Sequence, residues 1–263
     1  LVGIILGPTL LNIMQFDLLN GGGHSELVSE VIHFLSELGV ILLMFVAGLE
    51  LHIGELMKSG RVSALSGSLG VVVPLLMGWG VATLFGTEQN QAWFIGLALS
   101  ATSVSISAQT LLELGVLRTR VGLAMLGAAV FDDILVLLLL STVFIVVSGT
   151  GGFATIALTM GKMILFLVAA AAIGQFVVPR VLHVADRLLN RFGLLAIALV
   201  FMLLFAWAAE YMGGLASITG AFMAGLFMSQ LPSKARIEDG VLALAYGFFV
   251  PIFFVNIGLE VNL

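Results

Sequence analysis

The chain of 263 residues is strongly apolar: 60% of its residues are hydrophobic, only 10% are charged, and its mean hydropathy is +1.20. These values exclude an ordinary soluble domain, in which about 25% of residues are charged, and favour an integral membrane protein. The net charge of −5 offers no basic surface for nucleic acid, and the lack of Cys excludes disulfides and thiolate metal sites. Because the four His residues are also scattered along the chain, we expect no resident metal or other cofactor.

Nine apolar segments follow one another, separated by charged residues or by stretches rich in Gly and Pro. Most of them are long enough to cross a hydrocarbon core about 30 Å thick. They cover residues 1–16, 31–51, 63–86, 92–114, 120–148, 157–179, 193–210, 214–230 and 241–261. The predicted fold class is an all-α polytopic membrane protein with about nine transmembrane helices, in contact with the lipid bilayer.

The Lys and Arg residues predict the orientation of these segments, because positive charge collects in cytoplasmic loops. Nine of the ten follow the second, fourth, sixth and eighth segments: Lys58, Arg61, Arg118, Arg120, Arg180, Arg187, Arg191, Lys234 and Arg236. The first segment therefore runs outward, and the ninth ends outside. The exception is Lys162, near the outer start of the sixth segment, where its long side chain can snorkel to the membrane interface.

The fourth segment, GLALSATSVSISAQTLLELG, alternates polar and apolar residues from Ser103 to Gln109. A period of two inside a membrane span favours an unwound or extended stretch, whose hydroxyls and free carbonyls would face a cavity. Alternatively, the Ser and Thr hydroxyls bond to carbonyls four residues earlier, or the small side chains serve helix packing. The segment itself leaves both interpretations open, and the acids of the next segment favour the first.

Two adjacent acids, Asp132 and Asp133, interrupt the fifth segment in GAAVFDDILVLLLL. They follow Arg120 by 12 and 13 residues, about 18–20 Å of helix, which places them near the midplane of the membrane. Each acid costs about 2.5–3.5 kcal/mol there, and Asn would serve a pure packing role at lower cost. Desolvation and the neighbouring like charge favour protonation of at least one carboxyl, so the site can exchange a proton for a cation.

The geometry of a helix separates the roles of the two acids. Neighbouring side chains point about 100° apart, so one carboxyl can line an aqueous cavity while the other pairs elsewhere. Among the remaining polar residues, Glu37 is expected to pair near the interface and Glu210 to be solvated at the end of a segment. Asn256 joins helices or lines a cavity, and Pro251 is expected to kink the last segment. The stretch Ala221–Gly225 is expected to serve close helix packing.

Taken together, these stretches resemble the monovalent cation:proton antiporters of the second cation:proton antiporter family. The matching sequences, in the family's order, are GIILGPTLL, LSELGVILLMFVAGLEL, ALSATSVSISAQTLLELGVL, GAAVFDDILVLLLL, ITGAFMAGLFMS and PIFFVNIGL. The resemblance implies the antiporter fold with one discontinuous helix and a partial inverted repeat, in a homodimer of the inner or plasma membrane. It divides the chain into scaffold and dimerisation helices (1–60), core ion-transport helices (61–150), and linker and scaffold helices (151–263).

The resemblance also implies the roles of individual residues. Asp133 would carry the proton and bind the monovalent cation, with Asp132 as its neighbour in the paired-Asp, sodium-exchanging branch. Thr102 and Ser103 would lie at the crossing of the unwound helix, and Ser105 and Asn256 are weaker candidates. The chain would be truncated at both ends, lacking part of the first helix and the last three helices, with their membrane-embedded Lys.

The favoured function is therefore proton-driven exchange of Na⁺ or Li⁺ by alternating access, carried out by a transporter and not by an enzyme. Potassium/proton exchange, or an ion-gated sensor on the same fold, is the alternative, because hydroxyl and carboxylate ligands alone do not separate Na⁺ from K⁺. A remote alternative is an intramembrane aspartyl protease. Such an enzyme needs two acids on different helices, commonly with a GxGD motif, whereas these acids are adjacent and the motif is absent.

Overall fold

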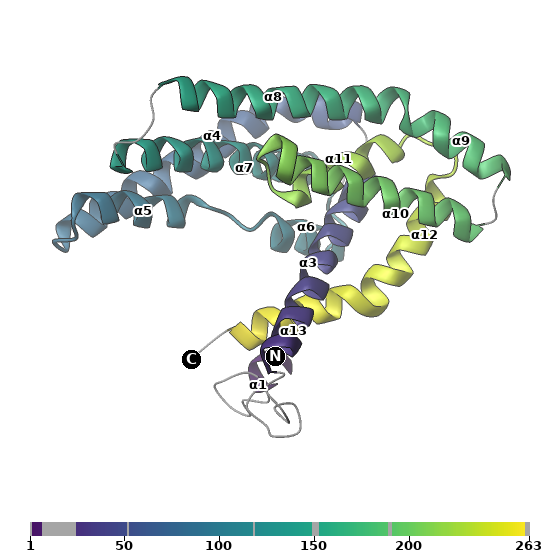
Figure 1. The fold of residues 1–263 in the computed structure, drawn as a ribbon, viewed down its shortest axis with the longest axis horizontal. Helices are drawn as coiled ribbons and strands as arrows, with labels where there is room; N and C mark the ends of the chain where they lie inside the picture. Colours follow the sequence, from purple (N-terminus) through teal and green to yellow (C-terminus); the bar gives the residue numbers. More distant parts are fainter. Residues whose placement is uncertain are drawn as a thin grey trace.

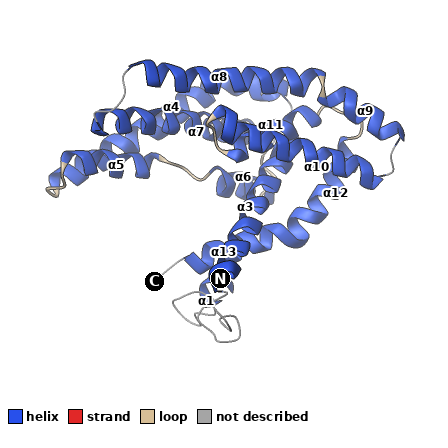
Figure 2. Cartoon of the chain, in the orientation of Figure 1, coloured by secondary structure: helices blue, strands red, loops and turns tan. Residues whose placement is uncertain are grey.

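The structure is a computed structural model in which residues 2–6, 25–51, 53–117, 119–148, 153–188 and 191–260 are described. Within these ranges the regular secondary structure is helical, and Figure 2 shows no strand among them. In chain order the elements are α1 (Val2–Leu6), α3 (Ser25–Glu50), α4 (Ile53–Leu84), α5 (Gln89–Ser100), α6 (Val104–Glu113), α7 (Arg120–Ser148), α8 (Phe153–Phe176), α9 (Val178–Leu188), α10 (Arg191–Ala208), the π-helix η2 (Ala209–Gly213), α11 (Ser217–Met228), α12 (Lys234–Leu244), the π-helix η3 (Ala245–Phe249) and α13 (Val250–Glu260).

Six helical stretches of the described chain are long and apolar enough to cross a membrane, so the protein is a multi-pass α-helical membrane protein. They are Leu27–Glu50, Gly60–Leu84, Arg120–Leu140, Ala157–Leu188, Phe192–Gly213 and Lys234–Leu259. The count of nine spans stays a prediction, because the fourth predicted segment is divided between α5 and α6, and α11 has only 12 residues. Of the first predicted segment, residues 7–16 lie outside the described residues. The inverted repeat also stays a prediction.

Helix α3 forms the centre of the molecule. Every residue from Ile41 to Leu49 is buried, which requires a helix that is apolar on all sides, and the sequence ILLMFVAGL supplies it. Along its length α3 packs against α11 and α13 and also contacts α6. Figure 1 shows it running steeply past the other helices towards α1 and α13. Helix α3 therefore contacts helices from the middle and from the C-terminal part of the chain.

Glycines allow α3 and α11 to approach closely. A methyl group added at Gly48 would overlap the carbonyl oxygen of Phe222, and one added at Gly225 would overlap the carbonyl oxygen of Phe45. The two glycines thus face each other's helix backbone in a reciprocal contact. This confirms the packing role predicted for Ala221–Gly225 and identifies Gly48 as its counterpart on α3.

A second packed group consists of α4, α5 and α7. Helix α4 lies along both α5 and α7, and it meets α5 at Gly78 and Gly96, where added methyl groups would collide with the other helix. The rings of Trp79 and Trp93 stack beside this crossing with their centroids 5.2 Å apart. This group therefore carries the first part of the interrupted fourth segment, in α5, and the acidic pair of α7.

Helix α9 replaces the basic loop that was expected after the sixth segment. Val178, Leu182 and Ala185 form its buried face, and this spacing of four and three residues is that of an amphipathic helix. At the edge of this face, half-buried Asp186 pairs with Arg236 of α12 at 2.5 Å. The sequence-based boundaries missed this helix because charged residues were interpreted as punctuation between spans.

The last predicted segment contains a π-helical turn just before Pro251, the position at which a kink was predicted. The π-helical turn η3 ends one residue before α13 begins at Val250. Proline has no N–H to donate, and its ring crowds the carbonyl four residues earlier, here that of Gly247. A widened π turn is one of the ways in which a helix accommodates this loss.

Candidate functional site

The fourth segment breaks at Ala101–Ser103, between the end of α5 and the start of α6. Ala101 has φ −73° and ψ 120°, and Ser103 has φ −84° and ψ 101°, so both are extended. The Ser103 side chain caps α6 by accepting a hydrogen bond from the Ile106 N–H at 3.5 Å. All three residues of the break are exposed. The interruption thus leaves polar backbone and hydroxyl groups accessible within an apolar segment.

The discontinuous helix was predicted, but its position was partly wrong. Residues 104–109, expected to be extended because of their alternating pattern, form helix α6. Local hydroxyl bonds support the helical state: Ser103 caps the first turn, and the Thr110 hydroxyl donates to the Ile106 carbonyl at 2.8 Å. Residues 104–109 are therefore helical, as the alternative interpretation requires, although the described bond to a carbonyl four residues earlier is that of Thr110, and the unwound stretch is confined to the three residues before α6.

The structure separates the two acids of α7. Asp132 is buried, with 4% of its surface exposed, and its Oδ2 accepts a hydrogen bond from the Thr102 hydroxyl at the break. Its Oδ1 is buried and makes no hydrogen bond within the described part of the chain. Asp133 is half-buried and lines a cavity of about 510 Å³. One acid thus pairs with the break and the other faces open space, as the angle between neighbouring helical side chains predicts.

The cavity beside Asp133 is formed where several elements meet. Ala101 contributes the end of α5, and the turn from η2 into α11 contributes Gly214 to Ile218. Gly214 takes φ +64°, a left-handed conformation that glycine adopts without steric cost. Thr219 follows in α11: it is 1% exposed, its hydroxyl faces the Asp133 carboxyl, and it makes no hydrogen bond of normal geometry among the described residues. A buried hydroxyl therefore lies next to the carboxyl that lines the cavity.

Two further acids, Glu37 of α3 and Glu210 of η2, line the same cavity. They also line a neighbouring cavity of about 280 Å³, together with Ser217. Glu37 lies inside the candidate span Leu27–Glu50 and is exposed. Because a charge facing lipid costs about 2.5–3.5 kcal/mol, this exposure is favourable only towards an aqueous space. In place of the expected pairing near the interface, Glu37 faces the cavity that leads to Asp133.

The orientation predicted from the basic residues indicates to which side of the membrane this cavity opens. Under that orientation, the turn between η2 and α11 would face the outer side, and α3 would run inward from Ser25. Exposed Glu37 and Glu210 would then lie on the outer side of half-buried Asp133 in the cavity. The predicted orientation thus implies access to the carboxyl at position 133 from the outer side.

Comparison with known proteins decides the family. The model of the family described as "sodium/hydrogen exchanger, transmembrane" matches residues 1–263. The chain belongs to this sodium/hydrogen exchanger family. It is 41% identical over 262 residues to a probable Na⁺/H⁺ antiporter, GerT, of Bacillus cereus, an alignment that covers 100% of this chain and 66% of that protein.

Two other exchanger relatives have similar coverage. The chain is 40% identical over 263 residues to the Na⁺/H⁺-K⁺ antiporter GerN of Bacillus cereus, covering 100% of this chain and 64% of the relative. It is 36% identical over 264 residues to a Na⁺/H⁺ antiporter of Enterococcus hirae, covering 100% of this chain and 65% of the relative. The chain thus spans just under two thirds of the length of these curated relatives. Because they are named as antiporters, the protease alternative is not favoured.

Of the residues that were predicted for this exchanger site, the structure brings Thr102, Ser103, Asp132 and Asp133 to one region, around the break and its cavity. Ser105 belongs to α6, but its side chain lies outside the described residues. Asn256 lies on α13, which packs against α1 and α3, apart from α7 in Figure 1. It is not among the described residues that line the Asp133 cavity. The structure instead adds Glu37, Glu210 and Thr219, which sequence reasoning missed as site residues.

Proposed function

We propose that the protein exchanges protons for monovalent cations, Na⁺ or Li⁺, across a cell membrane, with Asp133 as the group that holds either ion. The observation that carries this proposal is the position of Asp133: a half-buried carboxyl within an apolar span lines a cavity that exposed acids share. Hard cations prefer oxygen ligands, and a carboxyl that binds such a cation must release its proton. The relatives named as Na⁺/H⁺ antiporters support an exchange of protons for Na⁺.

The surrounding groups suit a dehydrated cation. The end of α5 lines the cavity at Ala101, and the C-terminal carbonyls of a helix carry partial negative charge. The buried Thr219 hydroxyl adds a third kind of oxygen beside the Asp133 carboxylate. Asp132 has a different role in this proposal. By accepting from Thr102 next to the N-terminus of α6, it fixes the break in position relative to α7.

Alternating access would come from movement between two packed groups. Helices α4, α5 and α7 pack on one another, whereas α3 packs on α11 and α11 on α10. The Asp133 cavity lies between these groups, since α5 and α7 line one side of it and α3, η2 and α11 the other. We infer that the core of residues 61–150 moves past the scaffold of residues 1–60 and 151–263, transferring Asp133 to the inner side. A homodimer held by the scaffold belongs to the same proposal.

Ion selectivity can be tested in proteoliposomes that contain the protein at its full natural length and a pH-sensitive dye inside. A proton gradient quenches the dye, and Na⁺, Li⁺ or K⁺ is then added in turn. We expect Na⁺ and Li⁺ to restore fluorescence at concentrations at which K⁺ does not, with protein-free liposomes as the control. An equal or larger response to K⁺ would replace the sodium assignment with the potassium/proton alternative.

The acids at the outer part of the cavity give a separate prediction. Replacing Glu37 and Glu210 with Gln removes two negative charges that line the path to Asp133. Because charged clefts raise the local concentration of oppositely charged ligands by a factor of ten or more, we expect the apparent KM for Na⁺ supplied from the outer side to rise roughly 3- to 10-fold, with kcat unchanged. Initial rates over a series of Na⁺ concentrations at low ionic strength measure this change.

Salt distinguishes this electrostatic effect from a structural one. In about 0.15 M choline chloride the screening length falls to about 8 Å, so the KM of the double variant should approach that of the unchanged protein. Glu88→Gln is the matched control, because Glu88 is an exposed acid outside the set of residues that line the cavity. A KM that does not change at low salt would remove Glu37 and Glu210 from the cation path.

A further inference from the structure

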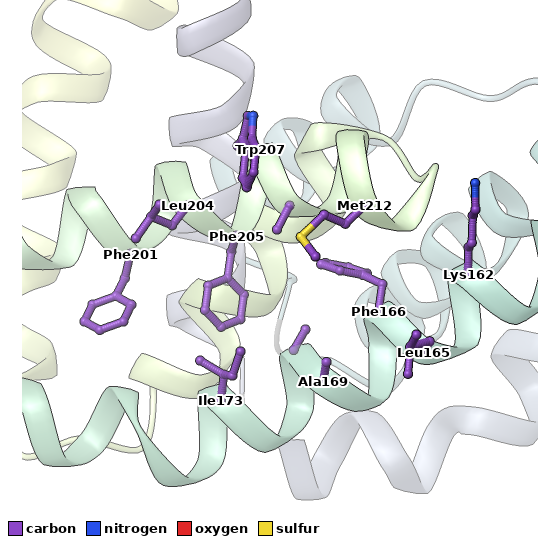
Figure 3. A pocket seen from close by; sticks show the side chains of 12 residues that line it. Lys162, Leu165, Phe166, Ala169, Ile173, Phe201, Leu204, Phe205, Trp207 and Met212 are labelled. Carbon is purple, nitrogen blue, oxygen red and sulfur yellow. The ribbon is translucent and has the colours of Figure 1, made fainter.

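A second cavity lies between α8 and α10, away from the acidic pair. Its volume is about 340 Å³. Figure 3 shows Phe166 and Ile173 rising from α8 on one side, with Phe205 and Trp207 of α10 and Met212 of η2 on the other. The described residues that line it are apolar except for Lys162, which is their only charged member. The cavity is thus an apolar space with a single positive charge at one end.

Lys162 is the basic residue that departs from the predicted orientation of the chain. Arg180 follows it by 18 residues, across the turn that joins α8 to α9. At the rise of a helix this is at most about 27 Å, close to the thickness of the hydrocarbon core. Because Arg180 is expected at the inner interface, Lys162 lies at the outer one. Its side chain is exposed, and Figure 3 shows the amine at the far end of the row of apolar side chains.

Aromatic residues border the cavity on the side of α10, and Figure 3 shows Trp207 nearer to Phe205 than to Lys162. Trp207 lines the cavity, and its ring stacks on that of Tyr211 with the centroids 5.9 Å apart. Both residues are largely exposed, at 54% and 73%. Trp and Tyr gather where the hydrocarbon meets the headgroups of a bilayer, because their rings are apolar and their N–H and O–H groups are polar. The exposed aromatic pair indicates that the cavity opens towards the interface, and the charge of Lys162 would hold a headgroup at its own end while an acyl chain points into the apolar part.

We propose that the cavity between α8 and α10 binds one anionic phospholipid of the outer leaflet, with an acyl chain among its apolar residues and the phosphate on Lys162. An acyl chain gains little from leaving the surrounding lipid for an apolar cavity, since both are equally apolar. The acyl chain therefore fits the ligand to the cavity without adding much binding free energy, and the charge of Lys162 determines which headgroup is preferred. An anionic headgroup keeps its net negative charge beside the ammonium, whereas a zwitterionic one carries its own cation.

The bound lipid would touch the element that also borders the transport cavity. Ala208 and Met212 line the lipid cavity, while Glu210 of the same turn lines the cavity of Asp133. Ordering of η2 by the lipid should therefore appear as increased thermal stability of the protein. This readout does not depend on transport, so it can fail or succeed independently of the proposed exchange.

The test uses the protein at its full natural length, purified in detergent and stripped of lipid. Melting is followed by intrinsic fluorescence after addition of phosphatidylglycerol or phosphatidylcholine with identical acyl chains, and bound lipid is counted by native mass spectrometry. We expect phosphatidylglycerol to raise the Tm by about 1–2 °C more than phosphatidylcholine does, the shift that follows from about a fivefold preference in a protein well above 250 residues. One tightly bound phosphatidylglycerol per chain should accompany the shift.

Two variants test the charge of Lys162 and the shape of the cavity separately, and a third serves as the control. Lys162→Gln should remove the preference for phosphatidylglycerol, while Lys234→Gln, which removes a lysine paired with Glu238 in α12, should leave it intact. Ala169→Trp fills the cavity from the exposed face of α8, so it should lower the binding of phosphatidylglycerol although Lys162 is present. Equal stabilisation by both lipids, unchanged binding to Lys162→Gln, or cross-linking of position 162 to a second copy of the chain at lipid saturation would overturn the proposal.

Discussion

Asp133→Asn is expected to abolish cation-driven proton release from proteoliposomes that contain the protein at its full natural length. The substitution preserves the shape of the side chain and its position in the cavity, but the amide neither binds and releases a proton near neutral pH nor supplies a negative charge. Both halves of the exchange are therefore lost together. We expect the rate to fall to that of protein-free liposomes, measured as dye dequenching on addition of Na⁺.

The same competition predicts a pH dependence in the unchanged protein. If one carboxyl holds either a proton or a cation, the apparent KM for Na⁺ should fall as the pH rises, until the carboxyl is already deprotonated when the cation arrives. Above that pH the KM should become constant. A KM that is the same at every pH would mean that the proton and the cation do not share Asp133.

Asp186→Asn provides the matched control for Asp133→Asn, because it makes the same chemical change outside the cavity. Asp186 pairs with Arg236, which is 53% exposed, and such exposed pairs contribute about 0–1 kcal/mol. The control should therefore retain transport. Melting curves of both variants would show whether the protein stays folded, and exchange at the normal rate by Asp133→Asn would remove this residue as the carrier.

Much of the architecture could be predicted because the membrane imposes simple requirements on sequence. A span must be apolar over its length, and a charge within it must have a compensating environment. These two conditions were enough to locate the main spanning helices and to single out Asp132 and Asp133. They act residue by residue along the chain, so they can be evaluated without knowing which helices touch.

The exact position of the break was harder to predict, because two local patterns competed. Alternating Ser residues after Ser103 suggested an extended stretch, yet these residues form α6, whose first turn Ser103 caps and whose Thr110 hydroxyl bonds to the Ile106 carbonyl. The break itself is held by a contact across 30 residues of sequence, from Thr102 to Asp132. Such a contact depends on how α6 and α7 pack, which the spacing of polar residues does not specify.

The cavity residues were missed for a related reason. Glu37 and Glu210 are separated by more than half of the chain, and they meet because α3 packs against α11 while η2 precedes it. One signal was available: Glu37 stands inside an apolar segment, as the two Asp residues do. Applying the same energetic argument to it would have identified a candidate for the site, although not its partner.

Gly48→Ala is expected to destabilise the protein by about 3 kcal/mol, near the upper end of the usual cost of overpacking. The added methyl group would overlap the carbonyl oxygen of Phe222, which belongs to the backbone of α11 and cannot rotate away. Helices α3 and α11 must therefore separate. For a protein of this size about 3 kcal/mol corresponds to a Tm lower by roughly 6–12 °C, provided that unfolding is reversible.

Gly161→Ala is the matched control, because nothing lies within 4 Å of a methyl group added at that exposed position of α8. Its Tm should stay the same or rise slightly, since Ala favours a helix more than Gly does. Helices α3 and α11 also carry Glu37 and Thr219 on either side of the Asp133 cavity. Their separation in Gly48→Ala should therefore also weaken Na⁺ binding, so a variant with normal Tm and normal KM would show that this close contact does not hold the site together.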